Sequence, residues 1–165
     1  MQKDDIAKQF EQLVKNNELL LRKVCNMYAY TPANREDLFQ DIVVQLWKAF
    51  PGFRGESKLS TWLYRVAINT SINGLRKKKD FIHSYEPAAL PADVADAGES
   101  VAEEQLQELY RAIEQLNEIE RAIVMLYLED RSYEEMEEIL GMSQGNLRVK
   151  MNRIKNKLRE LTKTN

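Results

Sequence analysis

Residues 132–161 constrain the fold of this chain more than any other stretch, and they read SYEEMEEILGMSQGNLRVKMNRIKNKLREL. Apolar residues recur at helical spacing from Tyr133 onward, and Gly141 then supplies the permissive turn that ends a short first helix. A second apolar stripe steps by three and four from Leu147 to Leu161. Two helices joined by a three- or four-residue turn that contains Gly predict a helix-turn-helix.

The outward face of the second helix follows from its period. At about 100° per residue from Leu147, the residues opposite the apolar stripe are Gly145, Val149, Asn152, Arg153 and Asn156. They are flanked by Arg148, Lys150, Lys155 and Lys157. Asn and Arg can pair with base edges, a valine can contact a thymine methyl group, and cations can hold phosphates. The pattern predicts DNA binding, against the alternative of an ordinary solvated basic helix.

Charge is segregated along the chain, although the net charge is only −2. The segment 93–143 carries fifteen acidic and three basic residues, whereas the segment 144–165 carries seven basic residues and one acid, Glu160. A nucleic-acid partner responds to such local patches rather than to their sum. The net charge therefore does not argue against DNA binding.

Neither the cysteine nor the histidine content indicates an enzyme or a metal site. Cys25 is the only cysteine and lies in an apolar helical run, which predicts a buried structural thiol and a reducing, cytoplasmic location. His83 is the only histidine and falls in a predicted linker. There is no Gly-rich phosphate loop and no nucleophile beside a base, and no apolar run has membrane-spanning length. We expect no catalytic residue, no metal, no cofactor and no membrane insertion.

The first half of the chain predicts three helices. One runs from Ile6 to Tyr30 with Ile6 and Phe10 on its buried face, and Thr31 and Pro32 end it. A second begins after Asn34, as a possible N-cap, and continues to Phe50 with Leu46 and Trp47 in its apolar set. Its polar face carries Glu36, Asp37, Gln40, Asp41 and Gln45, for which solvation and a partner surface are both open.

The loop PGFRGESKLSTW precedes the third helix and contains more Gly, Pro and aromatic residues than a simple turn requires. Ser60 or Thr61 is the expected N-cap, and Trp62 is expected in the core. Tyr64 is expected to point away from the core, and basic residues 76–79 end the helix. Aromatic residues interleaved with cations around a flexible loop are typical of a single-stranded nucleic-acid platform, and the alternative is a solubilised helix end.

The remaining segments complete an all-α chain of two small domains. We expect an N-terminal helical domain over residues 1–80, a flexible acidic linker over residues 81–104, and a C-terminal helix-turn-helix domain over residues 105–165. Helix is expected to resume at Leu106, and two helices joined near Asn117 precede the helix-turn-helix. Leu126, Tyr127 and Leu128 are expected on the buried face of the second of these.

Three motifs in this order resemble bacterial RNA polymerase sigma factors of the extracytoplasmic-function group. EDLFQDIVVQLWKAF is similar to the family's polymerase-docking helix, and FRGESKLSTWLYRVAINT resembles its promoter-melting loop and helix. LNEIERAIVMLYLEDRSYEEMEEILGMSQGNLRVKMNRIKNKLREL resembles its upstream-element reader. The resemblance covers nearly the whole chain.

The resemblance implies a role for each motif. Core polymerase would be bound through Asp37, Gln40 and Asp41. The −10 promoter element and its flipped base would be bound through Phe53, Arg54, Gly55, Glu56, Ser57, Lys58, Trp62, Arg65 and Asn69. The −35 element would be bound through Gln144, Asn146, Arg148, Val149, Asn152 and Arg153.

The function implied is that of a non-catalytic specificity subunit that directs promoter-specific transcription initiation. Its partners would be the clamp and flap regions of core polymerase, promoter DNA and an anti-sigma factor. The alternative is a free-standing helix-turn-helix regulator, for which the acidic helix and the two-glycine loop would have no use. A purely structural helical adaptor is a further alternative, but it leaves the segregated basic helix unexplained.

Overall fold

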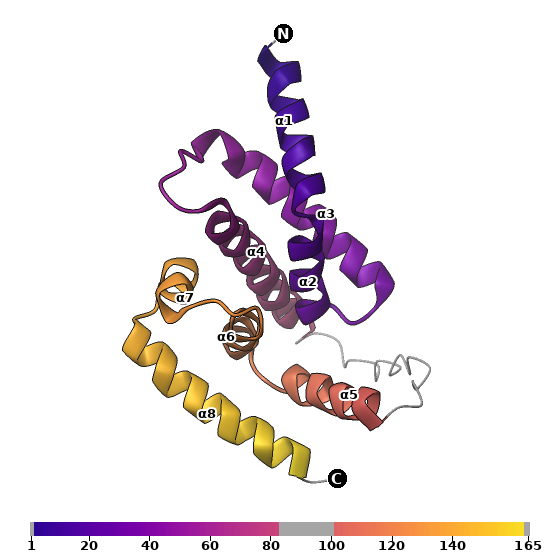
Figure 1. Ribbon diagram of the computed structural model, residues 1–165. Helices are drawn as coiled ribbons and strands as arrows, with labels where there is room; N and C mark the ends of the chain where they lie inside the picture. The colour runs from indigo at the N-terminus through magenta and orange to yellow at the C-terminus, as the bar shows by residue number, and fades with distance from the viewer. Residues whose placement is uncertain (1, 83–100, 164–165) are drawn as a thin grey trace. The chain divides into compact units, whose positions relative to one another are not determined.

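The computed structural model describes the backbone of residues 2–82 and 101–163 and the side chains of residues 2–77 and 101–162. Every regular element in these ranges is a helix, and no strand occurs in them (Figure 1). This confirms the predicted all-α class. None of the described helices is both long and apolar enough to span a membrane.

The chain divides into two compact units, Met1–Asp80 and Phe81–Asn165. The first contains α1 (Gln2–Asn16), α2 (Glu18–Tyr28), α3 (Pro32–Ala49), the short 3-10 helix η1 (Phe50–Gly52) and α4 (Leu59–Ile82). The second contains α5 (Val101–Glu114), α6 (Glu118–Leu128), α7 (Tyr133–Leu140) and α8 (Gln144–Lys163).

The predicted linker over residues 81–104 is helical at both ends, because α4 continues to Ile82 and α5 begins at Val101. Helix therefore resumes before Leu106. Glu103 and Glu104 lie in the first turn of α5, where a negative charge favours the helix N-terminus, so these acidic residues belong to a helix rather than to a linker. The prediction for residues 83–100, including His83, lies outside the described residues.

The single helix predicted from Ile6 to Tyr30 is two helices that meet at Asn17. The Asn17 side-chain amide donates to the carbonyl oxygen of Leu13 at 2.9 Å, and its backbone has φ −119° and ψ 16°. Asn competes for backbone hydrogen bonds in this way, which explains the break. Ile6 was expected to be buried but is 42% exposed, and Phe10 is the only buried residue of α1.

The N-terminus of α3 is capped by Thr31, not by Asn34 as predicted. The Thr31 hydroxyl accepts a hydrogen bond from the Asn34 backbone N–H at 3.1 Å. Pro32 occupies the first helical turn, where its missing N–H costs nothing and its fixed φ suits the helix. Thr31 and Pro32 therefore start α3 as well as separating it from α2.

The core of the first unit is formed by fully buried apolar side chains from α2, α3 and α4. They are Leu21, Val24, Cys25, Ile42, Leu46, Leu63, Ala67 and Ile68. One expectation was wrong here: Tyr64, expected to point away from the core, is buried at 2% exposure. Trp47, which belongs to the apolar set of the second predicted helix, is 45% exposed. Cys25 is confirmed as a buried thiol, and burial raises its pKa to about 11, opposed by the nearby Arg22 charge.

The second unit begins with α5 and α6, which meet at Asn117 as predicted. The Asn117 side chain accepts from the Glu120 N–H at 2.8 Å, and the Glu120 carboxylate accepts from the Asn117 N–H at 3.1 Å, which forms a capping box. Arg121 donates to the carbonyl oxygens of Leu116 and Glu114, so it satisfies the end of α5. Leu126 is buried as expected, but Tyr127 and Leu128 are 40% and 52% exposed.

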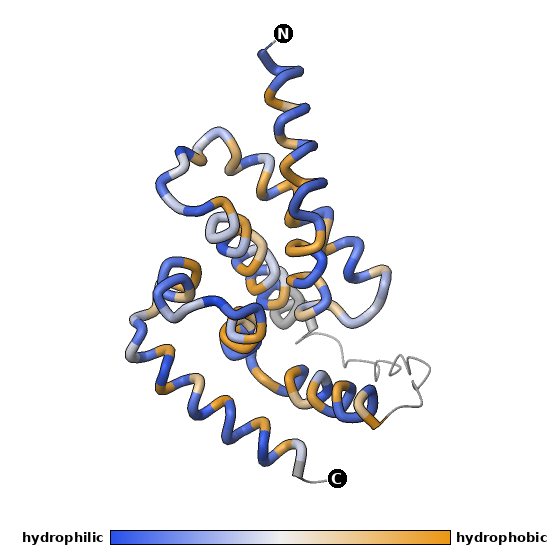
Figure 2. The backbone as a smooth tube through the Cα atoms, in the orientation of Figure 1, coloured by the Kyte–Doolittle hydropathy of each residue, from blue (hydrophilic) through white to orange (hydrophobic). Residues whose placement is uncertain are grey.

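The helix-turn-helix is confirmed as α7 and α8. Ser132 accepts from the Glu135 N–H and begins α7, and Gly141 ends it at φ 71°, where a residue with a Cβ would be strained. The Ser143 hydroxyl then accepts from the Asn146 N–H at 3.2 Å at the start of α8. Hydrophobic bands recur along α8 between polar residues (Figure 2). The buried members of that stripe are Leu147, Met151 and Ile154.

Candidate nucleic-acid and polymerase interfaces

The face of α8 opposite its buried stripe is exposed along most of the helix. Gly145, Val149, Asn152, Arg153 and Asn156 are all exposed, and Val149 is 49% exposed. Asn146 is exposed at the start of the helix, and Gln144 is half-buried. The face therefore presents amides, a guanidinium group and an apolar side chain together, which are the groups that read base edges in a major groove.

Several flanking basic side chains of α8 are held by neighbouring helices. The Arg148 guanidinium lies 5.1 Å from the Tyr133 ring centroid, and the Lys155 ammonium lies 4.8 Å from that of Tyr127. Lys157 Nζ lies 3.2 Å from a Glu120 carboxylate oxygen. These contacts lower the freedom of the basic side chains before any DNA is bound. Sequence reasoning missed them because each contact joins two different helices, whereas periodicity reports only on the faces of one helix.

The acidic cluster of α7 is not uniformly displayed. Glu134, Glu137 and Glu138 are exposed, whereas Glu135 is half-buried and its carboxylate lies 3.3 Å from the Arg131 guanidinium. The same Glu135 receives the Ser132 cap through its backbone N–H. At least one of the four carboxylates therefore helps to fix the start of α7.

The first residue of the loop before α4 packs its ring against an aromatic ring of α4. The Phe53 and Trp62 ring centroids lie 4.8 Å apart with the rings tilted by 34°, and Trp62 is 8% exposed. Trp62 is thus a core residue, as expected, and its ring packs against Phe53 at the start of the loop. Arg54, Gly55, Glu56 and Lys58 are exposed, Ser57 is half-buried, and Gly55 has φ 73°.

The predicted caps Ser60 and Thr61 lie inside α4, not before it. The helix begins at Leu59, the Trp62 N–H donates to the Lys58 carbonyl oxygen, and Thr61 is buried. Farther along α4, Arg65 is half-buried and Asn69 is exposed. Asn69 follows Trp62 by two helical turns, so it lies on the helix that the loop enters and displays its amide to solvent.

The acidic face of α3 is exposed, and a side chain of α2 holds two residues of α3 beside it. Asp37, Gln40 and Asp41 are exposed. Arg22 of α2 contacts Glu36 at 2.8 Å and lies 3.7 Å from the Phe39 ring centroid. The hydrogen bond to Glu36 raises the pKa of Arg22, so this guanidinium stays charged. Arg22 was missed by sequence reasoning because its partners lie on another helix.

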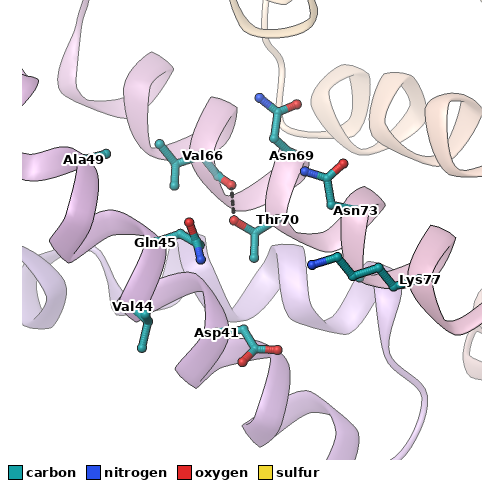
Figure 3. A pocket seen from close by; sticks show the side chains of 10 residues that line it. Asp41, Val44, Gln45, Ala49, Val66, Asn69, Thr70, Asn73 and Lys77 are labelled. Atoms are coloured by element: carbon teal, nitrogen blue, oxygen red, sulfur yellow. Dashed lines mark hydrogen bonds between the residues drawn. The ribbon is translucent and has the colours of Figure 1, made fainter.

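Two grooves separate α3 from α4. One of about 390 Å³ is lined by Asp37, Gln40 and Asp41 together with Ser71, Gly74 and Leu75. The other, of about 610 Å³, is lined by Asp41 and Gln45 from α3 and by Asn69, Asn73 and Lys77 from α4 (Figure 3). Asp41 borders both grooves. The structure therefore brings one predicted polymerase contact and one predicted −10 contact, Asp41 and Asn69, to the same groove.

Comparison with known families agrees with this arrangement. The family model for sigma-70 region 2 matches residues 13–81, and that for sigma-70 region 4 matches residues 106–158. The chain belongs to the sigma-70 family. Within that family it is a member of the extracytoplasmic-function group. No group of three or more metal-binding side chains occurs among the described residues of this sigma-family chain.

Relatives of known function include the ECF RNA polymerase sigma-E factors. The chain is 31% identical over 127 residues to that of Escherichia coli strain K12, covering 70% of this chain and 66% of the relative. The same values hold for the sigma-E factor of Salmonella typhimurium strain LT2. The sigma factor SigG of Mycobacterium tuberculosis is 46% identical over 44 residues, which is 27% of this chain and 12% of that protein. The chain thus spans about two thirds of the sigma-E factors' length.

Solved structures share the fold. The sigma factor RpoE of Bartonella quintana, crystallised with the anti-sigma factor NepR, has a TM-score of 0.75 and 24% identity over 94% of this chain and 98% of RpoE. CnrH, in complex with the cytosolic domain of CnrY, has a TM-score of 0.67 and 19% identity over 96% of this chain and 90% of that chain.

Proposed function

We propose that this chain is a sigma factor that binds core RNA polymerase and directs it to promoters through a −10 and a −35 element. The observation that carries the proposal is the presence of sigma-70 region 2 and region 4 in one chain and in that order. The relatives that match over 70% of this chain are named ECF RNA polymerase sigma-E factors, which supports the same function here. The protein supplies specificity and no catalytic step, and it works in the cytoplasm, where the polymerase is.

The −35 element is the proposed ligand of α8. Val149, Asn152 and Arg153 are exposed on the face opposite the buried stripe, where they can reach base edges. Arg148 lies against Tyr133 at the edge of that face, which suits a phosphate contact. Gln144 and Asn146 lie in the first turn of the helix, the part that enters the groove first in a helix-turn-helix.

The −10 element is the proposed ligand of the loop 53–58 and α4. The loop is exposed above the buried Trp62 ring, and Gly55 permits its left-handed turn. A shaped, exposed loop can hold an unstacked base, and the amide of Asn69 can bind a base edge nearby. In this proposal Trp62 acts through Phe53 and the loop, because its own ring is covered.

The polymerase is the proposed partner of the acidic face of α3. Asp37, Gln40 and Asp41 would contact the clamp of the largest subunit, and the second unit would contact the flap. An anti-sigma factor is a further proposed partner, as in the solved complexes of RpoE and CnrH with their partners. Arg22 would orient the docking face by holding Glu36 from α2.

Reconstitution with core polymerase tests the function. Purified protein and core enzyme are incubated with fragmented genomic DNA, and transcript starts are mapped. We expect starts that share two sequence elements and that are absent without the protein. Specific duplex binding without core enzyme, and no core-dependent transcript starts, would instead identify a free-standing helix-turn-helix regulator.

A further inference from the structure

Helix α8 carries basic side chains on both flanks of its exposed face. Counted at about 100° per residue from the buried Leu147, Arg148 lies at about 100° and Lys155 at about 80° around the helix. Lys157 lies at about 280°, on the opposite flank. A duplex that receives the exposed face in its groove places a phosphate backbone along each flank, so a cation on either flank can contribute to binding.

The cations on the first flank are held by neutral partners. Arg148 lies over the ring of Tyr133 on α7. Lys155 lies over the ring of Tyr127 on α6. A cation–π contact orients the cation, but the phenol ring brings no countercharge with it. Arg148 and Lys155 therefore keep their full charge for the DNA backbone.

On the opposite flank, Lys157 meets a carboxylate. Its Nζ lies 3.2 Å and 3.4 Å from the two carboxylate oxygens of Glu120 on α6. The same carboxylate accepts the Asn117 N–H in the capping box, and the Glu120 side chain is only 16% exposed, so its position is fixed. The Lys157 side chain is 52% exposed, and without this partner its ammonium would be free to turn towards a phosphate. The ion pair cancels the charge that would attract it there.

We infer that Glu120 is a specificity-determining residue of the −35 reader: by pairing with Lys157 it withholds one cation from the DNA backbone and so limits sequence-independent affinity. The inference rests on the proposed function, since it takes the exposed face of α8 as the face that binds the duplex. Phosphate contacts strengthen binding to every sequence, whereas base contacts discriminate between sequences. Cancelling a cation on the flank therefore weakens binding to wrong sites and leaves the base-reading side chains Asn152 and Arg153 untouched.

The test measures the affinity of the free full-length protein for a short, fully paired DNA duplex of mixed sequence, over a range of salt concentrations. Such a probe suffices because backbone contacts need no promoter sequence, and each one steepens the fall of log affinity with log salt by about 0.9. Glu120→Gln is the deciding variant. The Gln side chain still accepts the Asn117 N–H, since Glu and Gln both serve in a capping box, but it carries no charge. Circular dichroism and the urea midpoint check that the second unit stays folded.

Glu120→Gln is expected to bind the duplex about threefold to tenfold more tightly at low salt, with a salt slope steeper by about 0.9, because Lys157 gains one phosphate contact. Glu114→Gln is the matched control. It removes the same charge from an exposed position at the end of α5, and Glu114 forms no ion pair among the described side chains. It should leave the slope unchanged. Equal slopes in these two variants, or no duplex binding by Glu120→Gln, would overturn the inference.

Variants of Lys157 give a second arm. Glu120→Gln with Lys157→Gln replaces a neutral ion pair by two neutral amides, so the double variant should bind like the wild type, within twofold and with the same slope. Lys157→Gln alone keeps the Glu120 cap and should also keep the slope, whereas Arg148→Gln should make the slope shallower by about 0.9. A Lys157→Gln slope as shallow as that of Arg148→Gln would show that Lys157 already contacts a phosphate, which overturns the inference. These measurements use no polymerase, so core-dependent transcription still tests the proposed function separately.

Discussion

The ring of Phe53 lies 4.8 Å from the ring of Trp62, so the exposed loop is anchored at its first residue to a side chain that is 8% exposed. The Phe53 N–H also donates to the Phe50 carbonyl oxygen. The loop therefore leaves a fixed point and then turns at Gly55, whose φ is 73°. A loop fixed in this way has less entropy to lose when it holds a base.

Phe53→Ala is expected to impair promoter opening more than duplex binding. It removes the anchor of the loop and one ring of the aromatic pair, which contributes about 0.5–1.5 kcal/mol beyond its burial. Permanganate reactivity of promoter thymines should fall while the closed-complex affinity stays within twofold. Initiation should recover on a template with a pre-melted bubble. Phe53→Leu separates the roles, because an apolar anchor alone would keep opening intact.

Arg153→Ala is expected to lower discrimination among −35 sequences by about 1–3 kcal/mol, if its exposed guanidinium pairs with a base edge. Competition binding with single-base variants of the promoter measures this loss in the holoenzyme. Arg159→Ala is the control, because Arg159 is also exposed but lies more than a turn farther along α8. It should weaken all sequences alike. Equal sequence preference in the wild type and Arg153→Ala would remove Arg153 from the reader.

Asp41→Lys is expected to weaken binding to core polymerase at least tenfold, about 1.4 kcal/mol, because it places a cation on the acidic face of α3 that we propose as the docking face. Asp41 is exposed on α3, so the fold should be retained, which circular dichroism checks. Glu11→Lys makes the same charge change on exposed α1 and should leave the affinity unchanged. Titration of labelled protein with core enzyme gives both constants. An Asp41→Lys affinity equal to that of the wild type would place the interface elsewhere.

Gly141→Ala and Gly145→Ala should change the stability of the second unit in opposite directions. Gly141 has φ 71°, so a Cβ there is strained by about 1–2 kcal/mol, although nothing lies within 4 Å of it. Gly145 lies in α8 with equally open space, and Ala there should stabilise the helix by about 0.5–1 kcal/mol. Urea unfolding followed by circular dichroism measures both. A stabilised Gly141→Ala variant would contradict the left-handed turn.

Ionisation of the Cys25 thiol is expected to lower the stability of the first unit at high pH. Its folded pKa is about 11, above the ordinary thiol value of 9.0, because burial disfavours the thiolate. Its stabilising contribution is complete below pH 9 and is lost as the pH rises towards 11, since the unfolded thiol ionises first. The urea midpoint under reducing conditions should fall more steeply over this window in the wild type than in Cys25→Ala. Parallel curves would exclude the effect.

Periodicity predicted the parts of the fold in which one helix carries its own signal. The stripe of Leu147, Met151 and Ile154 predicted which face of α8 is buried, and Gly141 predicted the turn before that helix. The two sigma regions could likewise be recognised from contiguous motifs. In each case the information is local, because the residues that decide the structure lie within one or two turns of one another.

The predictions that failed concern helix ends, where neighbouring residues compete for the same role, and burial, which depends on contacts between different helices. Asn17 breaks an otherwise continuous pattern with a side-chain hydrogen bond, and Thr31 caps α3 in preference to Asn34. Tyr64 is buried and Trp47 exposed because packing, not hydropathy, decides which ring is covered. The shared position of Asp41 in two grooves depends on how α3 lies against α4, which no single motif contains.

The attachment of α1 has a consequence for how this unit opens. Phe10 is the only buried residue of α1, and its ring contacts those of Trp47 and Phe50 at 5.0 and 5.5 Å between centroids. Every side chain of residues 2–9 is exposed, and the N-terminal end of α1 extends past the other helices of the unit (Figure 1). Their amide protons should therefore exchange with solvent through local fraying, whereas those around Leu21 and Val24 exchange only when the unit unfolds.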